Sequence, residues 1–190
     1  MGRAFLLTGK PGVGKTTALV NTIGLLRGSG ATVGGMVSRE VRVGGIRKGF
    51  EIVDILTNRK GTLADVAGDG PRFGRYRVNL ADLDAVGVGA IRSSMEGADI
   101  VAIDEIGPME LLSTEFLKAI CEVLESEKPV IGTIHINLRR SFVAKVRPRW
   151  EVEIIEVTRE NRDEIPRKVA DSVLALLGGK YGSRQEKGPV

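Results

Sequence analysis

Four residues near the start of the chain have the types and spacing that bind nucleotide phosphates. Gly9, Gly14, Lys15 and Thr16 match GxxxxGK[ST] after a short apolar run. The backbone N–H groups of such a loop curve around a polyphosphate, and the following helix adds partial positive charge. Lys15 can reach the β- and γ-phosphates, and the Thr16 hydroxyl can bind Mg²⁺. We therefore predict that the loop binds a nucleoside triphosphate, through Thr8, Gly9, Lys10, Pro11, Gly12, Val13, Gly14, Lys15, Thr16 and Thr17.

A second group with chemical potential is a pair of carboxylates after an apolar run. Asp104 and Glu105 follow Ile100-Val-Ala-Ile, which is typical of a buried parallel strand that delivers charge to the carboxyl edge of a sheet. There Asp104 could hold Mg²⁺ opposite Thr16. Glu105 could orient or deprotonate a water that attacks the γ-phosphate. The alternative is an ordinary carboxylate pair at a helix start, and the phosphate loop upstream favours the metal and catalytic interpretation.

Two further stretches could supply polar groups to this site. Residues 129–134 form a buried-type strand, and Thr133 or His135 at its end would face the nucleotide if the strand lies between the other two. Residues 138–150 contain a basic cluster, which is either a solvated face or a lid that supplies a cation to the transition state. For the lid we favour Arg147 and Arg149 as catalytic residues.

The elements that must position these groups alternate between strand and helix. We expect an α/β fold of the P-loop NTPase type, a three-layer sandwich around a mostly parallel sheet with an inserted β-hairpin. The hairpin is predicted over Thr32–Val43 and Ile46–Leu56, with a glycine turn at Gly44 and Gly45. Residues 58–75 show no clear period and are predicted to be a loop with one helical turn at most. The remaining predicted elements are helices over 16–27, 81–95 and 114–125, strands over 76–80, 129–134 and 153–157, and a last helix that begins near Glu164.

Length and composition narrow the class of protein. A chain of 190 residues with 42% hydrophobic residues suits one domain, predicted over 1–177, with 178–190 as a disordered tail. No apolar run is long enough for a membrane span and no signal peptide is recognisable, so we expect a cytoplasmic protein. We also expect a monomer. The single cysteine, Cys121, excludes an internal disulfide and a cysteine-built metal site.

The net charge and the counts of a few residue types give weaker indications about binding partners and about the source of the protein. The net charge of +4 allows a nucleic-acid partner, but the basic residues are scattered along the chain and only 4% of residues are aromatic, so we do not favour one. A single glutamine, together with more arginine than lysine, is typical of a thermophilic source.

Four stretches together resemble one known family. Residues 9–16, 40–50, 103–110 and 157–162 are similar in order and spacing to the cancer-related nucleoside-triphosphatase family, over about residues 3–176. The resemblance implies a P-loop domain with an additional central strand and a catalytic glutamate, and Mg²⁺-dependent hydrolysis of ATP, GTP and other triphosphates. By matching positions it implies phosphate and metal binding by Lys15 and Thr16, the metal role of Asp104 and the catalytic role of Glu105. Asn161 and Arg162 lie where related folds hold the base, and the alternative for them is a helix cap and a surface charge.

Three classes of function remain open from the sequence. The adjacent Asp104 and Glu105 favour hydrolysis, because a carboxylate beside the γ-phosphate serves a water nucleophile. The hairpin and residues 58–80 could instead form an acceptor pocket, as a small-molecule or nucleotide kinase requires. The net positive charge allows an ATPase switch that acts on RNA or a partner protein, but no RNA-binding motif supports this class.

Overall fold

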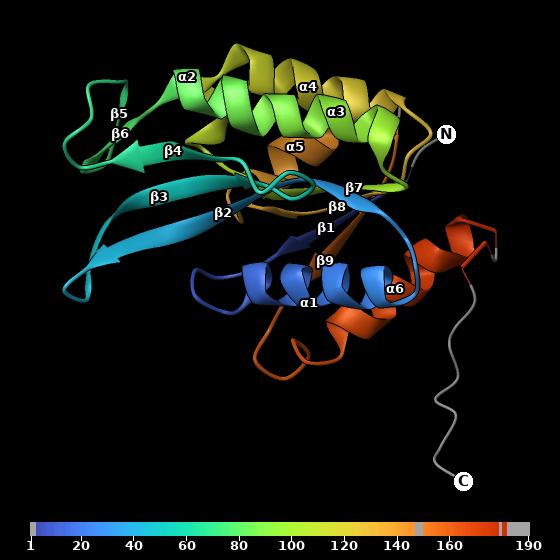
Figure 1. Ribbon diagram of the computed structural model, residues 1–190. Helices are drawn as coiled ribbons and strands as arrows, with labels where there is room; N and C mark the ends of the chain where they lie inside the picture. Colours follow the sequence, from blue (N-terminus) through green and yellow to red (C-terminus); the bar gives the residue numbers. More distant parts are fainter. Residues whose placement is uncertain (1–2, 147–149, 179, 182–190) are drawn as a thin grey trace, which may run out of the picture.

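The computed structural model describes residues 3–146, 150–178 and 180–181, and they form one mixed sheet between two layers of helices (Figure 1). The strand order is β5-β6-β4-β3-β2-β7-β8-β1-β9. The strands are β1 (Arg3–Thr8), β2 (Val33–Val43), β3 (Ile46–Asp54), β4 (Lys60–Asp65), β5 (Arg72–Phe73), β6 (Tyr76–Val78), β7 (Ile100–Ile106), β8 (Val130–Ile134) and β9 (Glu151–Glu156). The predicted three-layer α/β fold is confirmed.

The helices are divided between the two faces of the sheet. In Figure 1, α1 and α6 cover one face, and α2, α3 and α4 cover the other. The helical elements are α1 (Lys15–Gly28), α2 (Leu80–Asp82), the π-helical segment η1 (Leu83–Val88), α3 (Gly89–Gly97), the 3₁₀ turn η2 (Glu110–Leu112), α4 (Thr114–Glu125), α5 (Arg139–Val146) and α6 (Ile165–Leu176). No helix in the described part of the chain is long and apolar enough to span a membrane.

Each face of the sheet has its own apolar core. On one side Phe5, Leu7 and Ile100 pack with α1 and α6, and on the other side Leu6, Ile103 and Phe116 pack with η1, α3 and α4. Both faces of the central strands are therefore buried, which explains their continuous apolar runs. We call β1, β2, β7, β8 and β9 the parallel part of the sheet, because all the pairings between them are parallel.

The strands β3 to β6 pair antiparallel and continue the sheet beyond β2. We call this region, residues 46–78, the antiparallel extension. The predicted hairpin is confirmed as β2 and β3, with Gly44 and Gly45 at φ +56° and +77° in the connecting turn. Such angles are rare for residues with a side chain, so the turn favours glycine.

The prediction of a loop over residues 58–75 was wrong. This stretch contains β4 and β5, because β4 pairs with β3 and buries Leu63 and Ala64. Its other residues are polar or exposed, so the alternation that identifies a strand is too weak in the sequence. β4 is therefore a strand because it pairs with β3, and its local sequence pattern does not predict it.

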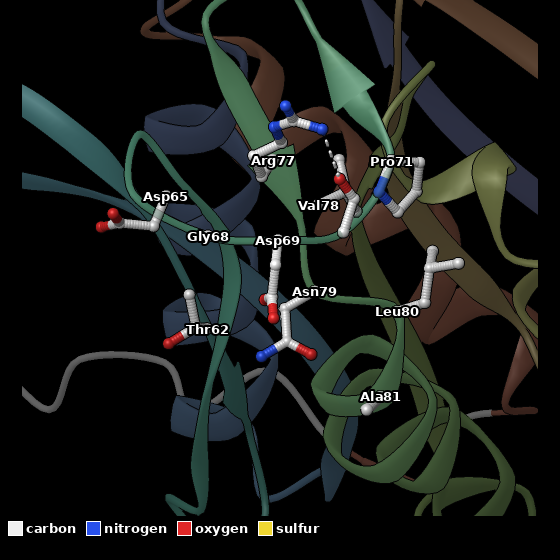
Figure 2. Close-up of a pocket in the computed structure, with 11 residues that line it drawn as sticks. Thr62, Asp65, Gly68, Asp69, Pro71, Arg77, Val78, Asn79, Leu80 and Ala81 are labelled. Atoms are coloured by element: carbon white, nitrogen blue, oxygen red, sulfur yellow. Dashed lines mark hydrogen bonds between the residues drawn. The ribbon is translucent and has the colours of Figure 1, made fainter.

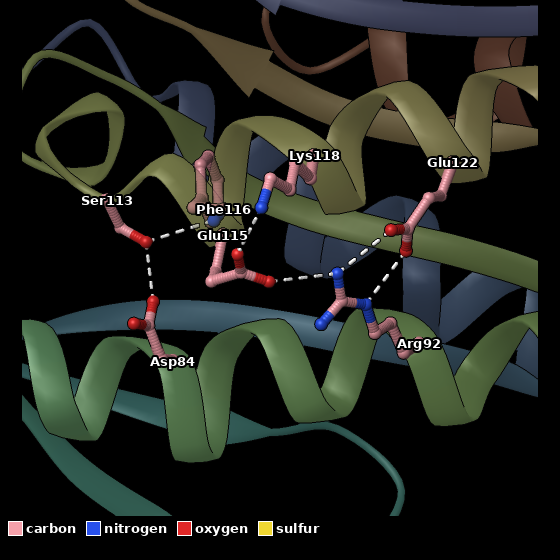
Figure 3. A network of polar contacts seen from close by, with 7 residues as sticks. All are labelled: Asp84, Arg92, Ser113, Glu115, Phe116, Lys118 and Glu122. Atoms are coloured by element: carbon pink, nitrogen blue, oxygen red, sulfur yellow. Dashed lines mark hydrogen bonds and ion pairs between the residues drawn. The ribbon is translucent and has the colours of Figure 1, made fainter.

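The helical segment 80–97 is continuous in spite of its glycines. Gly87 is buried, and a Cβ atom there would lie 3.0 Å from Met36 Sδ. The glycine thus allows η1 to lie close to β2. Polar contacts join this segment to α4: Arg92 pairs with Glu122 at 2.8 Å and Glu115 at 3.3 Å, and Ser113 Oγ donates to Asp84 at 2.5 Å (Figure 3). Ser113 also caps α4, since its Oγ accepts a hydrogen bond from Phe116 N.

Candidate active site

The phosphate loop connects β1 to α1, as the motif requires. Gly9 has φ +149°, and a Cβ atom there would lie 2.7 Å from the Val157 carbonyl oxygen. Only glycine lets the loop pass this close to the end of β9. Lys15 Nζ donates to the Gly9 carbonyl at 3.4 Å, so the ammonium is held over the loop. The backbone and the cation are therefore arranged for a polyphosphate.

Asp104 meets Thr16 because of the strand order. Since β8 lies between β1 and β7, the carboxyl ends of these strands converge at one edge. Thr16 Oγ1 donates to Asp104 Oδ1 at 3.2 Å, and Thr133 Oγ1 donates to the same oxygen at 2.6 Å. The strand predicted over residues 129–134 is β8, it meets the condition of lying between the other two strands, and Thr133 faces the site.

The Asp104 carboxylate is suited to hold a cation. It is 1% exposed, and its Oδ2 is buried without a hydrogen-bond partner among the described residues. Burial raises the pKa of Asp104 to about 6, although the hydroxyls of Thr133 and Thr16 oppose this change. A buried carboxylate oxygen that accepts no hydrogen bond and lies beside a threonine hydroxyl fits the ligand set of Mg²⁺ in a phosphate-loop site.

The protein alone does not complete a metal site here. Within the described ranges, no cluster of three or more His, Cys, Asp and Glu side chains is arranged to hold a metal ion. A Mg²⁺ ion at Asp104 and Thr16 would need phosphate oxygens and water for its remaining ligands. We therefore expect it to bind together with a nucleotide.

Glu105 and Lys15 face each other across the cleft. Lys15 Nζ and Glu105 Oε1 are 3.8 Å apart, which is within ion-pair distance but too long for a hydrogen bond. Glu105 Oε1 is buried and has no hydrogen-bond partner in the described part of the chain. A phosphate group between these two side chains would pair with the Lys15 ammonium and leave the Glu105 carboxylate available to a water molecule.

A third carboxylate, Glu110, also lines this cleft and was not predicted as a site residue. It begins the 3₁₀ turn η2 and is 3% exposed. Burial raises the pKa of Glu110 to about 8, and the charges of Glu105 and Asp104 add to this effect. No local pattern distinguishes it from a surface glutamate, so only the folding of its turn back under Gly107 reveals it.

Two other predicted residues are placed near the nucleotide loop. Both ends of the Asn161 amide are engaged within its own loop: Oδ1 accepts from Thr158 N at 2.8 Å, and Nδ2 donates to the Glu156 carbonyl at 2.9 Å. This arrangement favours the capping interpretation over a base contact. Arg162 is exposed, and its Cδ would lie 3.6 Å from a Cβ atom on Gly14. A nucleotide contact of Arg162 stays a prediction.

The two arginines favoured for the predicted lid are not among the residues that the structure describes. Arg147 and Arg149 lie outside the described residues. Of the same basic cluster, Arg139 belongs to α5 and pairs with Glu156 at 3.3 Å. His135 is half-buried at the end of β8 and lines the cleft.

The cleft that contains these groups has a volume of about 660 Å³ and extends from the phosphate loop to the antiparallel extension. A separate pocket of about 410 Å³ lies between β4, β6 and the start of α2 (Figure 2). Its walls carry Asp65, Asp69 and Arg77, and none of the predicted site residues lies there. The larger cleft is therefore the candidate active site.

The fold and this cleft together define a P-loop nucleotide-binding protein of the α/β class, in which an extra strand separates the phosphate-loop strand from the strand of the acidic residues. The family model described as NTPase matches residues 4–170. The chain belongs to this NTPase family and is a nucleoside-triphosphatase.

Relatives and solved structures agree with this family. The chain is 50% identical to the nucleoside-triphosphatase THEP1 of Thermofilum pendens over 91% of this chain and 96% of the relative. It is 44% identical to THEP1 of Methanosarcina acetivorans, over 90% and 97% of the two chains. The solution structure of a human cancer-related nucleoside triphosphatase has a TM-score of 0.77 and 32% identity, with 97% and 100% covered. The crystal structure of THEP1 from the hyperthermophile Aquifex aeolicus has a TM-score of 0.77 and 28% identity, with 90% and 98% covered.

Proposed function

We propose that the protein hydrolyses nucleoside 5′-triphosphates of several bases to the diphosphate and phosphate, in a Mg²⁺-dependent reaction in which Glu105 activates water. The observation that carries the proposal is the convergence of Lys15, Thr16, Asp104 and Glu105 at one sheet edge. We further propose that it acts as a cytoplasmic monomer.

Each of these side chains has a separate task. The loop amides and Lys15 bind the β- and γ-phosphates and neutralise charge on the transferred group. Thr16 and Asp104 would hold Mg²⁺, which when bound offsets negative charge on the phosphate oxygens. Glu105 accepts a proton from the attacking water, because its buried Oε1 lies 3.8 Å from Lys15 Nζ and accepts no hydrogen bond from the described residues.

Broad base specificity follows from where the recognition groups are. The loop binds phosphates through backbone groups, which do not distinguish one base from another. The one amide side chain near the expected base position, that of Asn161, is engaged by Thr158 and Glu156. The Asn161 amide is therefore not available to hydrogen-bond the edge of a base.

The test follows the γ-phosphate. The purified protein is incubated with γ-labelled ATP and Mg²⁺, without an acceptor, and then with GTP, CTP and UTP. We expect free phosphate in proportion to enzyme with each triphosphate, no release after chelation by EDTA, and no release by Lys15→Ala. Tight nucleotide binding without phosphate release would contradict the proposal. Turnover at the wild-type rate in Lys15→Ala would contradict the assignment of the site.

A further inference from the structure

The cleft is longer than the phosphate site needs. One end is formed by the phosphate loop with Lys15, Thr16 and Glu105, and the other end by residues of β2 and the antiparallel extension. This second end is formed by Ser38, Arg39, Glu40, Arg47, Phe50 and Phe73. The total volume of about 660 Å³ is within the range of sites that enclose a whole drug-sized ligand.

The sheet order shows on which side of the triphosphate this second end lies. Along the carboxyl edge, the loop with Arg162 follows β9, the phosphate loop follows β1, and Glu105 lies in β7, with β2 and β3 beyond it. A triphosphate whose γ-phosphate lies between Lys15 and Glu105 therefore has its nucleoside toward β9. The second end of the cleft lies past the γ-phosphate, on the side from which a nucleophile attacks. In Figure 1 the β2–β3 and β5–β6 hairpins project from the same end of the molecule as the loop before α1.

The side chains at this end have the chemistry of a nucleotide site. The Arg39 side chain lines the cleft, is exposed, and makes no hydrogen bond or ion pair with any residue that the structure describes. The Arg47 guanidinium lies 5.6 Å from the centre of the Phe50 ring and pairs with Glu40. Phe73 is 39% exposed although it is a large apolar side chain. Exposed rings and guanidinium groups stack on bases, and a free guanidinium binds a phosphate.

The charge of the antiparallel extension agrees with an anionic ligand. Residues 46–78 contain seven Lys and Arg against four Asp and Glu, which is three of the four excess positive charges of the chain. Three of the eight aromatic residues of the chain also lie there, Phe50, Phe73 and Tyr76. The ring of Phe50 contacts that of Tyr76 edge to face, with centroids 5.3 Å apart. Of these basic and aromatic residues, Arg47, Phe50 and Phe73 line the cleft itself.

We propose that this end of the cleft is a second subsite, which binds a nucleoside monophosphate and presents its phosphate to the γ-phosphate in competition with water. An oxygen of the monophosphate forms a bond to the γ-phosphorus, and the bond from that phosphorus to the β–γ bridging oxygen breaks. The products are two nucleoside diphosphates, with no oxidation or reduction. This inference rests on the proposed function, because it needs the triphosphate to bind at the phosphate loop.

The experiment adds an acceptor to the labelled reaction. The protein is incubated with γ-labelled ATP, Mg²⁺ and millimolar GMP, AMP, CMP or UMP, and labelled diphosphates are separated from free phosphate. We expect label in the diphosphate of at least one acceptor and none with Lys15→Ala, which excludes a contaminating kinase. We expect Arg39→Ala and Phe73→Ala each to raise the KM for the acceptor about tenfold or more. Leu117→Ala, an exposed apolar residue of α4 outside this cleft, is the matched control and should leave the KM unchanged.

A binding measurement keeps the test independent of the variants. Calorimetry of GMP, AMP, CMP and UMP with protein saturated by Mg·ADP should show one further site for the accepted monophosphate, weakened in Arg39→Ala. Free phosphate as the only labelled product with all four acceptors would overturn this inference and leave the proposed hydrolysis intact. If no label leaves ATP even without an acceptor, the proposed function itself fails.

Discussion

The parallel part of the sheet and the antiparallel extension place their polar residues differently. β8 is buried at every position and β7 at every position except Glu105, whereas both residues of β5 are exposed. In β7 and β8 both faces of the strand are buried, so the polar side chains lie toward the carboxyl ends, where Asp104 and Thr133 lie. In the extension polar residues occur along the whole strand. A polar residue therefore indicates the chemical site only where the rest of its strand is buried.

The largest expected effect tests the parallel part. Glu105→Gln should lower kcat by on the order of a hundredfold or more, because the amide cannot accept the proton of water, while binding of the Mg²⁺-nucleotide is kept. Glu51→Gln in the extension, which removes a carboxylate paired with Lys60 at 3.3 Å, should leave kcat unchanged. Phosphate release and calorimetry measure the two quantities. Loss of binding in Glu105→Gln would make Glu105 a structural or metal residue.

The next effect concerns Thr133, which donates a hydrogen bond to the Asp104 carboxylate. Thr133→Val removes the 2.6 Å hydrogen bond to Asp104 at nearly constant volume. We expect a fall of about tenfold to a hundredfold in activity and a higher Mg²⁺ concentration for half-maximal rate. Thr62→Val, an exposed position of β4, is the control. An unchanged Mg²⁺ dependence in Thr133→Val would remove Thr133 from the site.

A pH effect should distinguish the buried carboxylate Glu110 from exposed ones. Its pKa is about 8 when folded against 4.5 as the ordinary value, so between these pH values the folded protein holds a proton that the unfolded chain has lost. The free energy of unfolding of the nucleotide-free protein should therefore fall as pH rises from about 4.5 to 8, by up to about 1.4 kcal/mol per pH unit. Glu110→Gln should flatten this slope above pH 6. Asp104, whose pKa is about 6, contributes to the slope mainly below that pH.

Urea unfolding at a series of pH values measures this slope. The exposed carboxylate Glu115 is the matched control, because hydrogen bonds from Lys118 and Arg92 lower its pKa, and Glu115→Gln should leave the slope in place. If Glu110→Gln retains the full slope, another group is responsible for it.

The smallest effect is expected in the polar network of Figure 3, away from both parts of the cleft. Arg92 joins α3 to Glu115 and Glu122 of α4, but its side chain is 39% exposed and the pairs are open to solvent. Arg92→Ala should lower the free energy of unfolding by about 1 kcal/mol or less and leave phosphate release unchanged. A larger loss of stability would show that this network holds the helical layer on the sheet.

Much of the parallel part could be predicted from local sequence. The helix over 114–125 was predicted at the bounds it has in the structure, since Ser113 and the apolar spacing specify it. The loop from Gly9 to Thr16 was equally clear, because each position has its own physical requirement. β4 was missed because its pairing with β3, rather than its pattern, makes it a strand.

The sequence by itself determined the phosphate loop, the acidic pair Asp104 and Glu105, and most elements of the parallel part of the sheet, because these depend on residue type at short spacing. Only the tertiary structure decided that Thr133 holds Asp104, that Glu110 lies buried in the cleft, and that Arg39, Phe50 and Phe73 form its far end. The physical reason is the strand order: placing β8 between β1 and β7, and β2 with β3 beyond β7, brings together residues far apart along the chain. The spacing of residues along the chain does not show which of them become neighbours in this way.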